Sequence, residues 1–410
     1  MSSTPSGPSS GPTRPIDSRS LRGSYAAGLF SMGQAELLTL VIPLWAVLQG
    51  VSPAELGILI GARSMLTFVL AIHAGAVMDR LGTRRVMLFF AAATGGLAAI
   101  YPLLPWFPVM IAMQMIIGFA ANMGWMGAQT LIAQVTGGDP GQIGRFSFFS
   151  RIGNVVAPLL MGLLWDHAGP HLSFLGVTFW CILLFLAVAQ VRDDRRLESA
   201  TTAIAWRDLL PRLSDYTGSL GLVVIPAVAL TLAVSFIRHA TNGIEQSFFI
   251  VYLNDIGYAG TAIGALFSIA EVANGFASLF AGRLAKAMPI AWAMVGLTAV
   301  GISLIALTPF LGGIFAFLAI AHAVRRLTEG LVQPLMFSIQ ARAVASHLQG
   351  SIVGLRVTNN RLASILTPVA MGFVVQSFGV ERGFVVMGAA LLLVCAILAV
   401  AIAKSPGLRR

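Results

Sequence analysis

Long apolar stretches dominate the chain, and short polar segments or Gly- and Pro-containing segments separate them. The stretches lie at 24–50, 54–78, 85–104, 107–135, 145–166, 171–191, 222–253, 260–282, 288–309, 311–341, 351–376 and 383–403. Most approach or exceed the roughly 20 apolar residues with which an α-helix crosses the hydrocarbon core of a bilayer. Because the apolar runs are unbroken, the alternating strands of a β-barrel are excluded. The pattern predicts twelve membrane-spanning helices.

One long polar segment divides these stretches into two sets of six. It begins with Arg192-Asp-Asp-Arg-Arg and extends to Gly221. The predicted organisation is a disordered cytoplasmic tail at 1–22, a six-helix bundle at 23–191, a cytoplasmic central loop at 192–221, a second bundle at 222–403 and a tail at 404–410.

An internal repeat relates the two sets of helices. A shift of 210 residues superposes Arg151 on Arg361, Pro158 on Pro368, Gly162 on Gly372 and Gly169 on Gly379. A shift of 207 residues superposes Gly57 on Gly264 and Gly75 on Gly282. Both shifts preserve helix direction, so the sequence predicts two parallel repeats related by an axis along the membrane normal.

Composition and charge agree with a membrane protein. The chain is 57% hydrophobic and only 10% charged, which excludes a soluble protein. The net charge of +10 comes from Lys and Arg gathered at one set of helix ends. By the positive-inside rule both termini are cytoplasmic, with anionic lipid rather than nucleic acid as the expected partner. Cys181 and Cys395 lie in apolar runs and are expected to be core residues, not a disulfide or metal site.

The segment after the second predicted helix carries a recognisable motif. It reads Gly75-Ala-Val-Met-Asp79-Arg80-Leu-Gly82-Thr-Arg84-Arg85, and here the chain resembles the major facilitator superfamily. The resemblance covers essentially residues 23–403 and implies an all-α integral membrane fold of two six-helix repeats. It also implies that Gly75, Asp79, Arg80, Gly82, Arg84 and Arg85 form a conformational latch that holds the outward-facing state.

Two other segments compare less completely with the proton-linked efflux branch of that family. The fifth helix holds Gly153, Pro158 and Gly162 but has Ala157 and Met161 where the antiporter motif has glycines. Pro368 with Gly372 repeats the pattern, so helix packing is the expected role of these five Gly and Pro positions. Gln114 occupies the position of that branch's arginine, so any proton relay must use other groups.

Charged side chains inside the apolar helices are the candidate functional residues, because they are costly in a bilayer. Glu36 lies about halfway along the first helix and is the preferred proton carrier. The alternative is a permanent ion pair of Glu36 with Arg63 or Arg151. Further acids that could couple protons are Glu245, Glu271 and Glu329.

Polar residues on the same helices are the candidates for binding substrate. They are Arg63, Gln114, Asn122, Arg238, Asn242, Gln246, Arg325 and Gln333. Arg325 and Glu329, four residues apart, could instead neutralise each other. Arg151 and Arg361 are expected near cytoplasmic helix ends, where they snorkel or tie helices together.

The sequence lacks phosphate-binding loops and metal-ligand spacings, so neither ATP nor a metal cofactor is expected. The predicted function is a monomeric secondary carrier of a small solute in a bacterial-type inner membrane, not an enzyme. Proton-coupled export is preferred. Uptake of a small organic or inorganic anion, held by intramembrane arginines, is the alternative.

Overall fold

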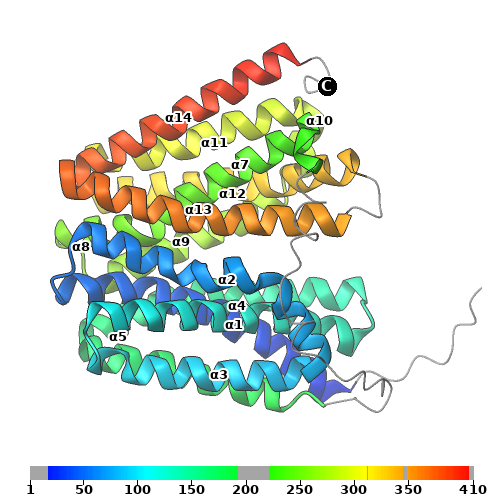
Figure 1. Cartoon of the computed structure of the whole chain (residues 1–410), viewed down its shortest axis with the longest axis vertical. Helices are drawn as coiled ribbons and strands as arrows, with labels where there is room; N and C mark the ends of the chain where they lie inside the picture. Colours follow the sequence, from blue (N-terminus) through cyan, green and yellow to red (C-terminus); the bar gives the residue numbers. More distant parts are fainter. Residues whose placement is uncertain (1–16, 193–220, 312, 345–348, 406–410) are drawn as a thin grey trace, which may run out of the picture.

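A computed structural model describes residues 17–192, 221–311, 313–344 and 349–405, which are almost entirely helical (Figure 1). The first half of the chain contains α1 (Ser18–Leu48), α2 (Pro53–Leu81), α3 (Thr83–Ile100), η1 (Tyr101–Leu103), α4 (Phe107–Thr136) and α5 (Pro140–Ala189). The central loop predicted at 192–221 lies almost wholly outside the described residues, as does most of the predicted tail at 404–410.

The second half contains more broken helices. They are η4 (Gly221–Val224), α7 (Pro226–Ile244), the π-helical turn η5 (Glu245–Phe249), α8 (Ile250–Asp255), α9 (Gly260–Ser278), α10 (Ala281–Ala287), α11 (Ile290–Ala306), η6 (Thr308–Leu311), α12 (Phe315–Ala343), α13 (Gln349–Phe378) and α14 (Val380–Lys404). α7, η5 and α8 follow one another without a gap and together replace one predicted helix.

The predicted number of twelve helices is confirmed when α5 is divided in two, α7, η5 and α8 are counted as one, and the seven-residue α10 is not counted. Its backbone leaves the helical region at Gly169, where φ is +81°, a value that L side chains rarely adopt. Gly379, the repeat equivalent, has φ of +82° and separates α13 from α14. The same glycine therefore makes the same turn in both repeats.

α1 begins earlier than expected, so the prediction that the tail extends to residue 22 is wrong for its last residues. Asp17 is the N-cap of α1 and accepts hydrogen bonds from the Ser20 hydroxyl and amide, 2.8 Å and 3.3 Å away. The hydroxyl bond, with further bonds from the first-turn amides, holds the pKa of Asp17 below its usual value. Residues 1–16 lie outside the described part of the chain.

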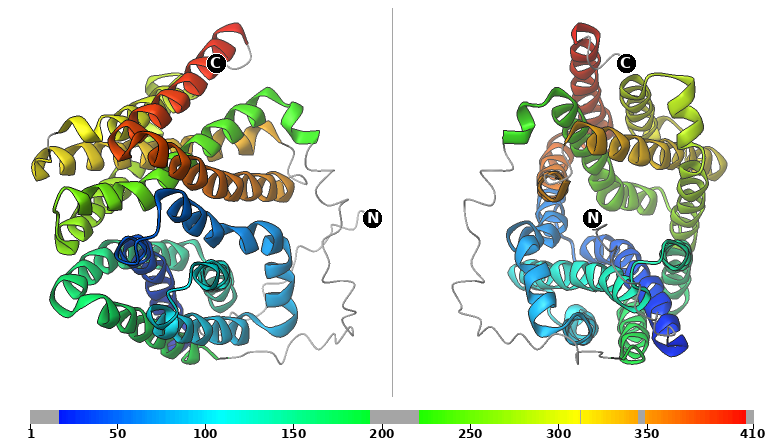
Figure 2. Two further views of the ribbon diagram at one scale, coloured as in Figure 1. Left: turned by 60° about the vertical axis from the view of Figure 1, so that its left-hand side comes forward. Right: turned by 90° about the vertical axis from the view of Figure 1, so that its right-hand side faces the viewer.

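The two halves form separate bundles, drawn in blue to green-cyan and in green to red in Figure 2. They meet where α2 contacts α13 and where α5 contacts α9. Gly57 faces the backbone carbonyl of Pro368, and Gly264 faces that of Pro158. These two contacts are repeat equivalents, and a side chain at either glycine would collide with backbone. These two contacts and the turn at Gly169 lie at the same end of the molecule, which we call the far end. It lies opposite the terminal end, where α1 begins and α14 ends.

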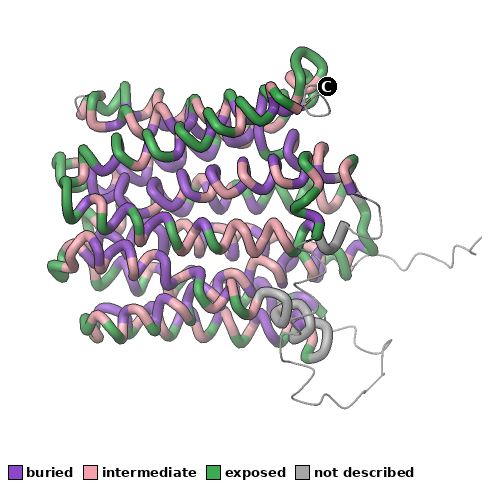
Figure 3. Tube along the Cα trace, turned by 45° about the horizontal axis from the view of Figure 1, so that its top comes forward, coloured by how far each residue is buried: buried purple, intermediate pink, exposed green. Residues whose placement is uncertain are grey.

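Apolar residues also cover much of the outside. Exposed positions recur along the helices (Figure 3), and many of them are large and apolar, such as Phe89 and Leu393. Among the described residues, eight helices are long and apolar enough to cross a membrane, or nine when α10 and α11 count as one bent span. Two of the predicted spans fail this test for visible reasons. The π-turn η5 divides the helix that begins with α7 into shorter pieces, and charged residues lower the mean hydropathy of α12.

Gly118 of α4 offers a test of the packing within the first bundle. A methyl group there would collide with the backbone carbonyl of Arg63 on α2. We expect Gly118→Ala to lower the free energy of unfolding by about 1–3 kcal/mol, the usual cost of overpacking. The measurement is thermal unfolding of the purified protein in detergent.

Gly96→Ala is the matched control, because nothing lies within 4 Å of a methyl group at that position of α3. It should unfold at the parent temperature or slightly above it, since alanine favours helix over glycine. Equal unfolding temperatures for the two variants would contradict the packing described here.

Candidate functional site

A cavity of about 270 Å³ lies between the two bundles. Residues of α1, α2 and α4 form its wall on one side, and residues of α7, η5 and α13 form it on the other. The polar residues of the wall are Ser31, Thr39, Arg63, Ser64, Gln114, Asn122, His239, Asn242, Gln246, Arg361 and Ser364. Five of the eight predicted substrate-binding residues therefore meet here: Arg63, Gln114, Asn122, Asn242 and Gln246.

Two arginines on this wall have only neutral partners. Arg63 donates to the hydroxyl of Thr39 at 2.9 Å and to the carbonyl of Ala35 at 3.1 Å, both on α1. Arg361 donates to the side-chain oxygen of Asn122 and so connects α13 with α4 across the cavity. No described carboxylate lies within 4 Å of either guanidinium, and the wall includes no acid. The cavity is therefore electropositive.

Gln114, Trp125 and Asn122 form the α4 side of the cavity. The Gln114 amide donates to the Tyr101 hydroxyl at 3.2 Å, and both residues are buried. Trp125 stacks on Phe146 with ring centroids 5.9 Å apart, which fixes the orientation of its indole. The α4 wall therefore offers amides and an aromatic ring beside the positive charges.

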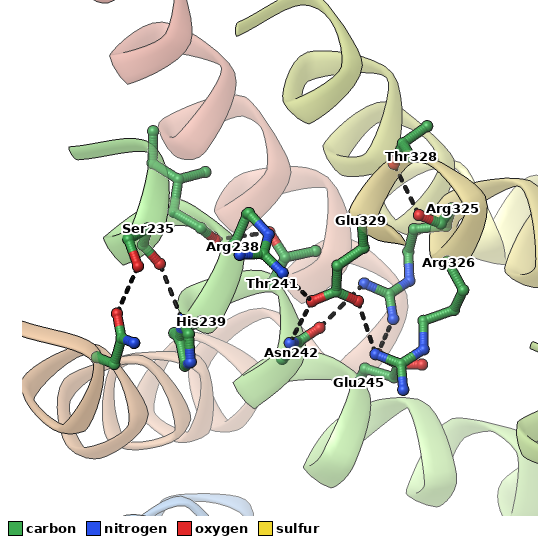
Figure 4. Close-up of polar contacts among 12 residues, drawn as sticks. Ser235, Arg238, His239, Thr241, Asn242, Glu245, Arg325, Arg326, Thr328 and Glu329 are labelled. Carbon is green, nitrogen blue, oxygen red and sulfur yellow. Dashed lines mark hydrogen bonds and ion pairs between the residues drawn. The ribbon is translucent and has the colours of Figure 1, made fainter. Parts of the chain in front are cut away.

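A second polar group of residues lies inside the second bundle, around Glu245 (Figure 4). Glu245 opens the π-turn η5 and is fully buried. It forms an ion pair with Arg325 of α12, and its carboxylate also lies 3.0 Å from Nε2 of His322 and 3.9 Å from Arg326. Such turns are frequent at functional sites because they change which side chains share a helix face.

Glu271 and Glu329 extend this group on the other side of Arg326. Arg326 forms an ion pair with Glu271 of α9, and its Nη1 lies 2.6 Å from the Glu329 carboxylate. Glu329 also accepts a hydrogen bond from Asn242 at 2.6 Å and lies 3.4 Å from Arg238. We call the six residues Arg238, Glu245, Glu271, Arg325, Arg326 and Glu329 the charge network.

The charge network is balanced and closed to solvent. It holds three guanidinium groups and three carboxylates, none of them more than 9% exposed. Buried charges are tolerated only when they are paired in this way, and removal of one partner is far more costly than loss of the pair. Asn242 belongs to both sites, because it lines the cavity and hydrogen-bonds Glu329 and Arg325.

Several predicted positions differ from this arrangement. Arg238 and Arg325, expected to bind substrate, are in the charge network and do not line the central cavity. Gln333 is exposed and also absent from that wall. The alternative considered for Arg325, an ion pair with Glu329 of the same helix, is not formed within 4 Å. Arg325 pairs instead with Glu245 of η5, which directly follows α7, a helix in contact with α12.

Arg361 is the residue that sequence reasoning misplaced most. We expected it at a helix end, but it lies near the middle of α13 on the cavity wall. Its repeat equivalent, Arg151, is exposed, so the two positions have different surroundings. Arg361 has a partner in the other bundle, Asn122. No signal in the sequence pairs Arg361 with Asn122.

Glu36 lies between the cavity and the charge network. It is partly buried in the middle of α1, and its charge interacts electrostatically with Arg326 and with Arg63. Within the described chain it makes no hydrogen bond and no ion pair within 4 Å, so the permanent pairs considered for it with Arg63 or Arg151 are not formed. Glu36 is the one candidate proton carrier outside the charge network.

The predicted latch is described only in part. The helix α2 continues to Leu81, so Asp79 belongs to its last turn and not to a loop as expected. The side chains of Asp79 and Arg80 lie outside the described residues. Arg84 donates to the carbonyl of Ala189 at 3.1 Å and so ties the start of α3 to the end of α5.

Comparisons with known proteins agree with the two-bundle fold. The sequence profile of the Major Facilitator Superfamily matches residues 25–244 and again 231–410. The chain therefore belongs to this superfamily, as its motifs led us to expect. It is a multi-pass membrane protein and a secondary transporter of small solutes rather than an enzyme.

Solved structures of transporters superpose on nearly the whole chain. The nucleoside transporter NupG matches with a TM-score of 0.77 at 15% identity, covering 95% of this chain and 100% of that one. A bacterial homolog of the human lysosomal transporter Spinster, inward-facing and occupied, matches at 0.74 and 16%, covering 97% and 99%. A POT family transporter in complex with 5-aminolevulinic acid matches at 0.71 and 12%, covering 94% and 96%. At identities this low, the structural similarity shows a common fold.

Removal of Arg326 should reveal the balance of the charge network. Arg326→Gln leaves Glu271 without an ion-pair partner among the described residues, and we expect a loss of about 3–5 kcal/mol of stability. The double variant Glu271→Gln/Arg326→Gln removes the charge together with its partner and should recover most of that loss. The measurement is thermal unfolding of the purified proteins.

Arg361→Gln is the control for loss of an arginine in itself, since the partner of Arg361 in the described part of the chain, Asn122, is neutral. Its cost should be clearly smaller. A single Arg326→Gln variant as stable as the double variant would contradict the balance described here.

Proposed function

We propose that this transporter carries a small organic anion together with a proton. The observation that supports the anion is the cavity wall, which contains Arg63 and Arg361 but no carboxylate. An anion between the two guanidinium groups would replace their neutral acceptors with a charged one, and pairs of Arg with a carboxylate are among the strong hydrogen bonds of proteins. Because Arg63 belongs to one bundle and Arg361 to the other, such an anion would contact both bundles.

The volume of the cavity favours a small solute. At about 270 Å³ it lies just below the range of roughly 300–1,000 Å³ that drug-sized ligands occupy. Asn242, Gln246 and Ser364 provide further hydrogen-bonding groups on the second bundle. A compact acid with a few hydroxyl, amide or amino groups fits this wall better than a large apolar cation.

The position of Glu36 supports the proposed coupling to protons. The charge of Glu36 interacts electrostatically with Arg326 of the charge network and with Arg63 of the cavity wall, and a nearby positive charge stabilises a carboxylate. An anion that neutralises Arg63 would remove the contribution of Arg63 while that of Arg326 remains, and Glu36 would then take up a proton more readily in a site with little water. The anion and the proton would therefore bind together, and an inward proton gradient would drive uptake.

Export by proton antiport is the second candidate, favoured by the segment from Gly153 to Gly162. Gly162 packs against the backbone of Gly260, and Gly153 packs against that of Leu29, so the segment lies at two close helix contacts. The two functions differ in how solute binding affects proton binding. In antiport, solute binding displaces the proton, whereas in our proposal the anion promotes proton binding.

We place both termini in the cytoplasm of a bacterial-type cell, with the protein in the inner membrane. α1 begins and α14 ends at the same end of the bundle (Figure 1). Arg84 and Arg145 lie near the starts of α3 and α5 at that end, and Lys404 is the last residue of α14, in agreement with the positive-inside rule. We expect a monomer in contact with anionic lipid, which needs neither nucleic acid nor a resident cofactor.

Loss of either cavity arginine should weaken anion transport. Arg63→Gln and Arg361→Gln each remove a charge with little change in volume, so we expect affinity to fall about 10- to 100-fold, as for loss of a hydrogen bond to a charged group. Counterflow in proteoliposomes with a panel of small carboxylates and their uncharged amides measures this.

Gln333→Ala serves as the control, because Gln333 is exposed and lies off the cavity wall. It should transport like the parent. If amides or cations are transported as well as the carboxylates, and both arginine variants keep this activity, the anion proposal is wrong.

Glu36→Gln should separate transport from coupling. The variant keeps a polar side chain of similar size, so exchange of labelled anion across the membrane should continue, while accumulation driven by a pH gradient should be lost. Glu381→Gln, at an exposed position in the first turn of α14, is the control and should accumulate normally. Gradient-driven accumulation that survives in Glu36→Gln would assign the proton to another group.

A further inference from the structure

A carboxylate of the first bundle caps a helix of the second bundle at the far end. Asp166 lies in α5, three residues before the turn at Gly169. It accepts hydrogen bonds from the Gly260 amide at 2.7 Å and from the Thr261 amide at 2.7 Å. It also accepts one from the Thr261 hydroxyl at 2.6 Å. These amides belong to the first turn of α9, whose own N-cap residue, Ala259, makes no side-chain cap. The second bundle thus depends on the first for this cap.

The repeat places a second cap of the same kind across the other contact between the bundles. Gln376 of α13 accepts a hydrogen bond from the Ala54 amide in the first turn of α2 at 3.2 Å. Residue 376 is residue 166 shifted by the repeat distance of 210, so the two caps are structural equivalents. Each bundle therefore caps one helix of the other, at the same end of the molecule.

The two caps differ in strength for identifiable reasons. Asp166 is charged, accepts three hydrogen bonds and faces the positive end of the α9 dipole. Gln376 is neutral and accepts one, and α2 already has its own capping box from Ser52 and Glu55. The Asp166 cap is therefore the stronger of the two.

Both caps lie beside the closest backbone contacts between the bundles. Gly162 packs on the backbone of Gly260, the residue that Asp166 caps, and Gly372 packs on that of Pro53. For the cavity to open at the far end these backbones must separate, and the separation breaks the caps. When they break, the first-turn amides of α9 lose their only side-chain acceptor among the described residues.

We propose that Asp166 is the principal lock of the gate at the far end and that Gln376 is its weaker counterpart. The lock acts on the conformational equilibrium, independently of the solute and of the proton carrier. Its unequal halves make α5 with α9 the contact that limits opening, while α2 with α13 separates more readily.

Accessibility of a cysteine in the cavity tests this lock. The probe is Ser364→Cys on the cavity wall, in a chain whose buried cysteines, Cys181 and Cys395, are replaced by alanine. A charged maleimide that does not cross membranes is applied to right-side-out and to inside-out vesicles. Asp166→Ala should raise the rate of labelling from the far end about fivefold, the population shift that loss of one helix cap produces, and lower it from the terminal end.

A variant of the weaker cap, Gln376, should change far-end labelling in the opposite direction. Gln376→Glu adds a negative charge at the start of α2 and should slow labelling from the far end. Ser377→Ala is the neighbouring control, because among the described residues the Ser377 hydroxyl hydrogen-bonds only to the Phe373 carbonyl of its own helix. It should label like the parent. Unchanged labelling in Asp166→Ala, or faster far-end labelling in Gln376→Glu, overturns the proposal.

A helix cap supplied from within the second bundle distinguishes a lock between the bundles from simple stabilisation of α9. In Asp166→Ala/Ala259→Asp the new aspartate occupies the N-cap position of α9 itself. Thermal stability should return toward the parent value while labelling from the far end stays fast. If the internal cap restores the slow labelling of the parent, Asp166 acts only by stabilising α9 and the lock is excluded.

Discussion

The bilayer offers no water to solvate a buried charge, and the second bundle is arranged around that constraint. Three arginines and three glutamates from α7, η5, α9 and α12 neutralise one another where none is more than 9% exposed. Because a buried ion pair is far more costly to break than to omit, this network joins its helices into one unit. Charges committed in this way are not available to a solute.

The remaining intramembrane charges gain their meaning from that balance. Arg63 and Arg361 face the cavity with neutral partners, and Glu36 stands between Arg63 and Arg326 without a direct partner among the described residues. Asn242 connects the two regions, since it hydrogen-bonds the network and lines the cavity. The unbalanced groups are therefore the ones able to exchange partners during transport, while the network provides a fixed frame.

Much of the fold could be predicted from the sequence because hydrophobic length and repeated glycines are local signals. The spans, the repeat and the turns at Gly169 and Gly379 needed only one-dimensional patterns. Ion-pair partners could not be predicted in the same way. Spacing along α12 suggested Arg325 with Glu329, but the partner of Arg325 is on another helix. Arg361 was misplaced for the same reason, since Asn122 lies 239 residues away in the sequence.

The central claim is that an anion in the cavity and a proton on Glu36 bind together. Calorimetric titration of the purified protein with the best carboxylate of the transport panel, in buffers of different ionisation enthalpy, measures the protons exchanged on binding. We expect proton uptake on binding in the parent and its loss in Glu36→Gln. Proton release on binding, or an uptake that Glu36→Gln leaves unchanged, would contradict it.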